Sequence, residues 1–195
     1  MSVKYSTTTA DYLDWDVMLN LIRRLYKDGN CRISLLIGCG CFFGLRISDI
    51  LSLSWDMILE GDSFAINEKK TGKKRIIKIN DGFQKHIKDC FNALKIQDKN
   101  EKCFLSNKNT VYSVQRVNVI FKEIKKKYNL KIEHFSTHSC RKIFGRKVVE
   151  NAGENSEMAL IKLSELFNHS SPMITRRYLG LRHEELMNVY EELTF

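Results

Sequence analysis

The chain is organised around the stretch from residue 160 to residue 180, which reads LIKLSELFNHSSPMITRRYLG. An amphipathic run ends at Phe167, and Ser171 and Pro172 then supply an N-cap and a first helical position, which predicts a second helix. Tyr178 lies near the end of that helix, directly after two arginines. Because guanidinium groups require solvent or an anion, this setting is unusual for a core aromatic and indicates an anion-binding site.

The composition is that of a basic globular protein. A length of 195 residues fits one domain, and 43% hydrophobic residues are enough for a sizeable core. The 32 Lys and Arg residues outnumber the 23 Asp and Glu residues, which leaves a formal net charge of +9. This excess favours a polyanionic partner, although charge alone also fits a merely basic soluble protein.

The six cysteines predict buried thiols in a reducing cytoplasm. They form no CxxC pair and no metal-ligand spacing with histidine, so we expect no metal and no cofactor. The N-terminus lacks the apolar segment of a signal peptide, and the apolar run at 33–45 is too short to cross a bilayer. We therefore expect a cytoplasmic protein without a membrane partner.

The apolar pattern predicts a mainly α fold with a small antiparallel three-stranded β-sheet. Helices are expected at 14–28 and at 31–43, the second closed by Gly44, and Ser48 is expected to cap a third. The polar residues 1–10 are expected to form an arm or linker ahead of one domain at 11–195. Strands are predicted at 57–59, 63–67 and 75–79, and further helices at 82–95, 110–128, 137–151, 155–167, 172–179 and 182–193.

Six polar side chains stand out by their position in these elements. They are Arg46, Lys70, His138, Arg141, His169 and Tyr178. Taken singly, each has an ordinary structural interpretation, such as an ion pair with a nearby carboxylate, a solvated turn or a helix cap. His138 and Arg141 are three residues apart at the start of a helix, so they lie on one face and can contact the same ligand.

The order and context of these residues resemble the catalytic domain of the tyrosine recombinase/integrase family. The resemblance covers residues 44–181 and includes the lysine-bearing β-turn. The nine-residue step from His169 to Tyr178 is the usual spacing in the family. The other matching strings are GLRISDILSLSW, THSCRKIFG and NHSSPMITRRYL.

The resemblance implies roles for the first group of residues. Arg46 and Arg141 match the two arginines that grip the non-bridging oxygens of a scissile DNA phosphate. Lys70 matches the general acid that protonates the leaving 5′ oxygen, with Lys69 and Lys73 close enough in the sequence to be alternatives.

The remaining candidates are implied to act at the nucleophile. Tyr178 matches the nucleophile, which forms a 3′-phosphotyrosyl intermediate without metal or ATP. His138 matches the residue that assists proton transfer, and His169 the one that hydrogen-bonds the phosphate. Arg176 and Arg177 are expected to contact DNA or a neighbouring protomer.

Further contacts follow from the same resemblance. Asp49 is expected to hold Arg46 by a salt bridge. The residues of the basic turn expected to contact DNA phosphate are Lys69, Lys73, Lys74 and Arg75.

Two departures from the family pattern are visible. Asn168 stands where the family usually has glycine, and asparagine tolerates a positive φ. We expect the helical core-binding domain that precedes the catalytic domain in most relatives to be absent. The expectation is then either an excised fragment or a short recombinase that is little more than a catalytic domain.

The resemblance implies double-stranded DNA as the partner and a tetramer on two DNA sites, with a monomer when free. In the family the C-terminal helix docks into a neighbouring protomer, while packing on its own domain is equally open for this chain. The expected activity is integration, excision or inversion of DNA. Two alternatives are a type IB topoisomerase-like relaxing enzyme and a catalytically silent DNA-binding regulator.

Overall fold

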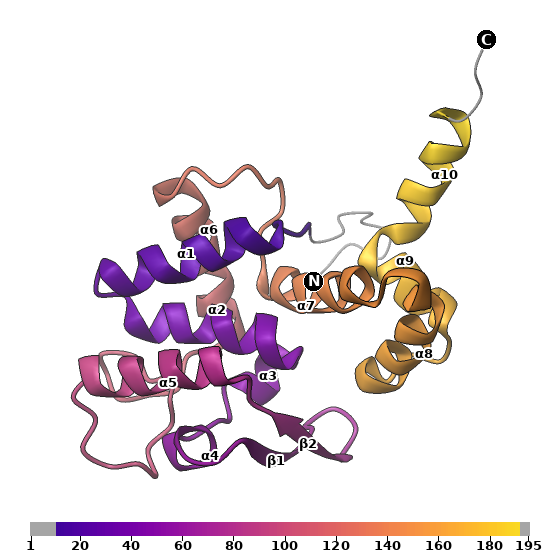
Figure 1. Ribbon diagram of the computed structural model, residues 1–195. Coiled ribbons are helices and arrows are strands. Elements are labelled where there is room, and N and C mark those ends of the chain that lie inside the picture. Colours follow the sequence, from indigo (N-terminus) through magenta and orange to yellow (C-terminus); the bar gives the residue numbers. More distant parts are fainter. Residues whose placement is uncertain (1–10, 192–195) are drawn as a thin grey trace. The chain divides into compact units, whose positions relative to one another are not determined.

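The computed structural model describes residues 11–191 as helices and one two-stranded sheet, divided into two compact units (Figure 1). The first unit ends at Ile143 and the second begins at Phe144. The predicted arm at 1–10 and the end of the predicted C-terminal helix lie outside the described residues. Within the described part, no helix is both long and apolar enough to cross a membrane.

The first unit is built around α2 (Cys31–Phe43), which lies between α1 (Trp15–Lys27) and α5 (Asp81–Ala93) (Figure 1). The α2 sequence is apolar on nearly every face, and most of its side chains are buried. A helix that is hydrophobic all round has to lie inside the fold, where α1 and α5 cover it.

The end of α2 sets the chain direction for the residues that follow. Gly44 ends the helix with φ 59°, a left-handed conformation that glycine adopts without steric cost, so the predicted closure is confirmed. The next helix, α3 (Ile47–Ile50), is a single turn. The prediction that Ser48 caps it is wrong, because the extended residue before the turn is Arg46, whose carbonyl accepts the first helical amides.

The sheet has two strands rather than the predicted three. β1 (Ser63–Asn67) and β2 (Lys74–Lys78) pair antiparallel, with the end of β1 opposite the start of β2. The third predicted strand, at 57–59, is part of α4 (Trp55–Leu59). Its buried residues Trp55 and Ile58 are three apart, which is helical spacing rather than strand alternation.

The predicted helix at 110–128 is α6 (Val114–Lys127) and begins later than expected. Val111 forms an isolated β-bridge, so the chain is still extended there. Ser113 then caps the helix, because its Oγ accepts the Arg116 amide. α7 (Thr137–Ala152) follows, and the boundary between the units falls within it.

The second unit is a small helical cluster. Its core consists of the buried residues Leu160, Leu163, Phe167 and Leu179. After the end of α7 it contains a 3-10 turn (Gly153–Asn155), α8 (Ser156–Phe167), α9 (Pro172–Leu179) and α10 (Leu181–Glu191).

Candidate active site

Two arginines bond to the carboxyl end of α2, and a third follows it. Arg75 Nη2 donates to the Phe43 carbonyl at 3.0 Å, and Arg141 Nη1 donates to the Gly44 carbonyl at 2.6 Å. Arg46 follows two residues later. The last carbonyls of a helix lack intrahelical partners and carry partial negative charge, so these guanidiniums stabilise the helix end. The same contact brings Arg141, from α7, to the chain segment that carries Arg46.

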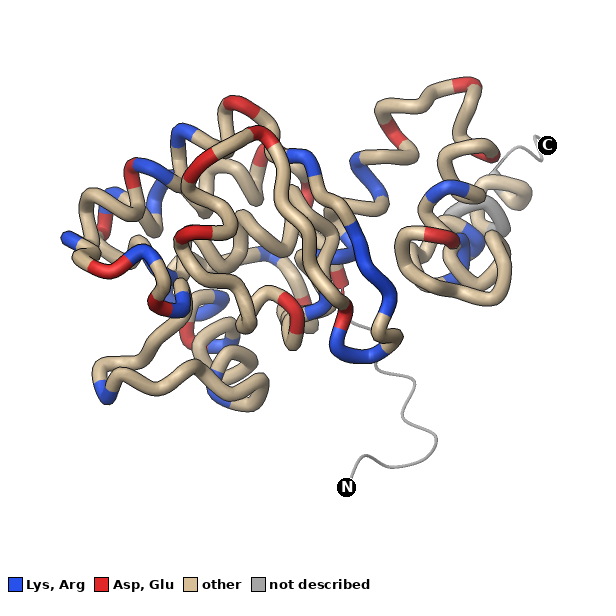
Figure 2. The backbone as a smooth tube through the Cα atoms, turned by 90° about the horizontal axis from the view of Figure 1, so that it is seen from below, with Lys and Arg blue, Asp and Glu red and all other residues tan. Residues whose placement is uncertain are grey.

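The hairpin turn between β1 and β2 is held by hydrogen bonds to its backbone. Asp49 Oδ1 accepts the Lys69 amide at 2.9 Å, and the Gly72 amide donates to the Glu68 carbonyl at 2.8 Å. These bonds fix the backbone on both sides of Lys70, whose side chain is exposed. Basic residues gather along this turn (Figure 2).

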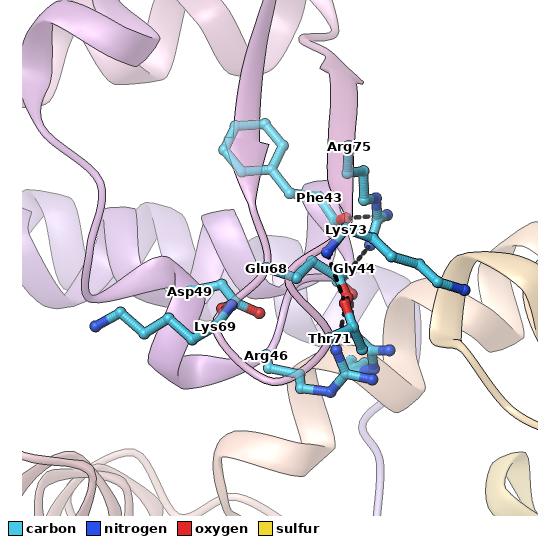
Figure 3. Close-up of polar contacts among 10 residues, drawn as sticks. Phe43, Gly44, Arg46, Asp49, Glu68, Lys69, Thr71, Lys73 and Arg75 are labelled. Atoms are coloured by element: carbon cyan, nitrogen blue, oxygen red, sulfur yellow. Dashed lines mark hydrogen bonds and ion pairs between the residues drawn. The ribbon is translucent and has the colours of Figure 1, made fainter.

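One acidic residue in the turn was not predicted as part of the site. Glu68 is only 4% exposed, and its Oε2 accepts both Arg46 Nη1 at 2.8 Å and Thr71 Oγ1 at 3.0 Å (Figure 3). Its Oε1 accepts Arg75 Nη1 at 3.4 Å. Burial alone would raise the pKa of Glu68, but these hydrogen bonds and the arginine charges together lower the pKa below its ordinary value.

The contacts of Glu68 correct the expected partner of Arg46 and give Arg75 partners within the chain. The ion pair that the structure shows for Arg46 is with Glu68, whereas Asp49 accepts a backbone amide instead of holding Arg46. Arg75, expected to contact DNA, directs its guanidinium to Glu68 and to the Phe43 carbonyl, and its side chain is only 12% exposed. A structural role at the end of α2 accounts for it.

Strand alternation is the sequence signal that identifies both residues. In β1 the buried residues Phe64 and Ile66 occupy alternate positions, so Glu68 continues the inward face. In β2 the buried Ile77 likewise puts Arg75 on the inward face. A carboxylate and a guanidinium that both face inward at the end of one hairpin predict an ion pair.

Helix α7 places His138 one turn before Arg141. Partial desolvation, followed by the charges of Arg141 and Lys142, lowers the pKa of the His138 imidazole, although the side chain is exposed. A lowered pKa favours the uncharged imidazole, which is the form that can accept a proton. Arg141 and Lys142 are both buried, with exposed fractions of 5% and 7%.

In the second unit, Tyr178 lies against two other rings. Its ring centroid is 5.4 Å from that of His169 and 5.8 Å from that of Phe167, both in edge-to-face geometry. His169 Nδ1 is 2.9 Å from the hydroxyl of Thr175, which is fully buried. This hydrogen bond fixes the plane of the imidazole ring.

The helix that carries Tyr178 is fixed at both ends. Asn168 takes a left-handed conformation with φ 54° after α8, and Ser171 caps α9 by accepting the Ile174 amide at 3.4 Å, as the sequence predicted. At the other end, Arg146 Nη1 donates to the Leu179 carbonyl at 3.1 Å.

The two arginines that precede Tyr178 have different surroundings. Arg176 forms an ion pair with Glu157 of α8, and its side chain is 19% exposed. Arg177 is exposed. Of the two, Arg177 is therefore the more accessible to an external anion.

The six candidates thus form one group in each unit. In the first unit, Arg46, Arg141 and the turn that carries Lys70 lie around the end of α2, and His138 lies one turn before Arg141 on α7. The second unit brings His169 and Tyr178 together. Figure 3 shows the side chain of Lys69 directed away from the Arg46–Glu68 pair. Among the side chains that the structure describes in residues 11–191, no group of three His, Cys, Asp or Glu residues could hold a metal ion.

Comparison with known proteins identifies the family. A model of the Phage integrase family matches residues 12–185, which is most of the chain. The chain therefore belongs to this family, the tyrosine recombinases, and its fold is that of their catalytic domain. The family is one of enzymes.

Individual relatives agree with this assignment. The chain is 30% identical over 172 residues to a probable integrase/recombinase, YoeC, of Bacillus subtilis (strain 168), which covers 87% of this chain and 89% of that protein. It is 25% identical over 150 residues to a probable integrase/recombinase of Acholeplasma phage L2, covering 76% of this chain and 49% of the relative.

Solved structures share the fold at lower identity. The XerA recombinase superposes with a TM-score of 0.70 at 18% identity, over 100% of this chain and 68% of the other. A lambda integrase dimer bound to a COC′ core site gives a TM-score of 0.64 at 19% identity, over 90% of this chain and 49% of the other.

Proposed function

We propose that this protein is a site-specific DNA recombinase that cleaves and rejoins DNA through a 3′-phosphotyrosyl intermediate, in integration, excision or inversion. The observation that carries the proposal is that, in a member of the integrase family, Arg141 bonds to the Gly44 carbonyl two residues before Arg46, while Arg46 bonds to Glu68 at the lysine-bearing turn. Two guanidiniums from distant parts of the chain at one place suit the oxygens of a phosphate.

The charges around the end of α2 support an anionic substrate. Three guanidiniums, those of Arg46, Arg75 and Arg141, lie around the end of α2, and the Glu68 carboxylate accepts hydrogen bonds from two of them. Guanidinium groups held in fixed positions suit the non-bridging oxygens of a phosphodiester. Their effect would be strongest when negative charge develops in the transition state.

The proposed step transfers a phosphoryl group. The Tyr178 oxygen forms a bond to phosphorus while the bond from phosphorus to the 5′ oxygen breaks. The phenol proton passes to the uncharged imidazole of His138, and Lys70 donates a proton to the leaving 5′ oxygen. His169 hydrogen-bonds the phosphate. Because the ester bond is retained on the enzyme, another 5′ hydroxyl can reverse the step without ATP.

The proposed partners are double-stranded DNA and other copies of the chain. The exposed lysines of the hairpin turn and the exposed Arg177 would contact the DNA backbone, and such binding weakens steeply with salt. Relatives of the same fold have been solved as a XerH complex with a difH substrate and as a lambda integrase tetramer on a Holliday junction. By analogy we propose that four copies act on two DNA sites.

The test requires a DNA site, which selection can supply. A randomised duplex library is selected on the Tyr178→Phe protein, which should bind DNA but not cleave it. The selected sequence is then built into a nicked suicide substrate, and the covalent protein–DNA adduct is measured on a denaturing gel without metal or ATP. The wild type should form the adduct and Tyr178→Phe should not. An adduct with Tyr178→Phe would exclude Tyr178 as the nucleophile.

The same assay separates the alternatives. Tight binding of the selected site without any adduct would support a catalytically silent regulator. Relaxation of a supercoiled plasmid that lacks the selected site would support a topoisomerase-like enzyme.

A further inference from the structure

A single buried carboxylate joins the two elements that carry Arg46 and Lys70. We infer that Glu68 is a positioning residue for strand cleavage, which holds the Arg46 guanidinium and the Lys70 turn in one fixed arrangement. The inference rests on the proposed function. It assigns a role to a residue that belongs to none of the sequence motifs and has no part in the proposed chemical step.

The contact with Arg46 orders a long side chain before substrate binds. Arg46 lies on an extended residue ahead of the short helix α3, and its side chain is 21% exposed. An arginine in that position has many rotamers, and fixing them on binding costs conformational entropy. The 2.8 Å charge-assisted bond from Arg46 Nη1 to Glu68 Oε2 selects one of them in advance.

The contacts with the turn fix the neighbours of Lys70. Glu68 is the first residue after β1, and its carbonyl accepts the Gly72 amide while its amide donates to the Lys73 carbonyl at 3.0 Å. The same Oε2 that binds Arg46 also accepts the hydroxyl of Thr71, the residue after Lys70. One oxygen atom is therefore shared between the arginine and the turn (Figure 3).

Arg75 explains how a carboxylate can lie beside a phosphate-binding arginine. A carboxylate that belonged to Arg46 alone would compete with the phosphate for it. Here Glu68 Oε1 is bound by Arg75, which is itself anchored to the Phe43 carbonyl. Because Arg75 shares the negative charge, Glu68 orients Arg46 without fully neutralising it.

The test compares Glu68→Gln with the wild type on the selected nicked substrate, under single turnover at saturating protein. The rate constant and the final amplitude of adduct formation are recorded separately, because partial misfolding lowers the amplitude and mispositioning lowers the rate constant. We expect a rate constant lower by about 10- to 100-fold, as for a displacement of about 1 Å in an active site, with DNA affinity little changed. The control is Glu60→Gln, an exposed glutamate paired with Lys99.

A double-mutant cycle shows whether the effect passes through Arg46. In an Arg46→Ala background, Glu68→Gln should lower the rate constant by less than about 5-fold, because residues that act through one another are not additive. Two results would overturn the inference. One is an effect of about 10- to 100-fold for Glu68→Gln that persists in the Arg46→Ala background, and the other is a wild-type rate constant for Glu68→Gln alone. If wild-type protein itself forms no adduct, the proposed function fails and the inference falls with it.

A second variant keeps the inference testable if Glu68→Gln does not fold. Thr71→Val removes the hydroxyl that joins Glu68 to the turn, together with the weaker bond that this hydroxyl accepts from the Lys73 amide at 3.3 Å. It should lower the rate constant by about 3- to 10-fold, less than Glu68→Gln does, because the bond between Arg46 and Glu68 remains. An unchanged rate constant for this folded variant would count against a shared oxygen that couples Arg46 to the Lys70 turn.

Discussion

The two groups of candidate residues are held by different forces. In the first unit, charged hydrogen bonds dominate: Glu68 binds two arginines, and Arg141 bonds to the end of α2. In the second unit, packing dominates: Tyr178 lies among aromatic rings, and the Leu179 side chain of its helix lies against Gly145 of α7, where a Cβ would clash with it.

This difference fits the two tasks in the proposed reaction. A phosphate must meet charges that are already oriented, because reorienting them during the reaction would cost free energy. A phenol must present one oxygen in one direction, and steric packing of its ring and helix can achieve that. The first group should therefore be sensitive to loss of charge, and the second to changes of volume.

The largest effect is expected from the removal of a guanidinium in the first unit. Arg141→Ala should lower the rate constant of adduct formation by about 10²- to 10³-fold, the usual cost of losing one transition-state donor. It should also lower thermal stability, because the buried Gly44 carbonyl loses its partner. The suicide-substrate assay and thermal unfolding by circular dichroism measure the two effects. Arg141→Lys is the control, and a rate within about tenfold of the wild type for the alanine variant would contradict the role.

The second effect tests packing in the other unit. A Cβ at Gly145 would lie 2.6 Å from Leu179 Cδ2 and 3.3 Å from Phe167 Cε2. Gly145→Ala should therefore destabilise the protein by about 3 kcal/mol, at the upper end for overpacking. Thermal unfolding checks the loss, and the double variant Gly145→Ala/Leu179→Val should recover part of it by removing the clash. An alanine variant as stable as the wild type would show that α9 adjusts freely.

The sequence predicted the parts of the fold that have local signals. α1, α2 and α9 begin or end at capping residues, and Asn168 has the positive φ that its position required. Part of α4 was predicted as a strand because five residues are too few to distinguish the helical period of about 3.6 residues from the strand period of two. The burial of Trp55 and Ile58 in the core favours the helical conformation of this segment.

The site was predictable where spacing carries the information. His138 and Arg141 were expected on one helical face, and α7 carries both. The partner of Arg46 was not predictable in the same way, because Asp49 is its near neighbour in sequence while Glu68 is its neighbour in space. Strand alternation indicates that Glu68 and Arg75 share the inward face of the hairpin, but only the folded structure shows that Arg46 also reaches Glu68.

The third effect concerns the charge of Glu68 and is measured as the free energy of unfolding at different pH values. The pKa of Glu68 is lowered in the folded state, so its ionised form stabilises the protein above the unfolded pKa of about 4.3, and this contribution is lost as the pH falls through the folded pKa. Glu68→Gln should cost about 2 kcal/mol near neutral pH, the range for a hydrogen bond to a charged group. The difference from the wild type should shrink below about pH 4. A difference that does not change with pH would show that the charge of Glu68 is unimportant.

The smallest effect is expected at the buried hydroxyl behind His169. Thr175→Val keeps the shape of the side chain but removes the hydrogen bond to His169 Nδ1, so the imidazole loses the contact that orients its ring. Stability should fall by about 1 kcal/mol, as for one neutral hydrogen bond, and the rate constant of adduct formation by about 3- to 10-fold. Thr175→Ser, which keeps the hydroxyl, should retain the rate while losing some packing. If serine and valine slow the reaction equally, volume rather than the hydrogen bond orients His169, and the second unit depends on packing alone.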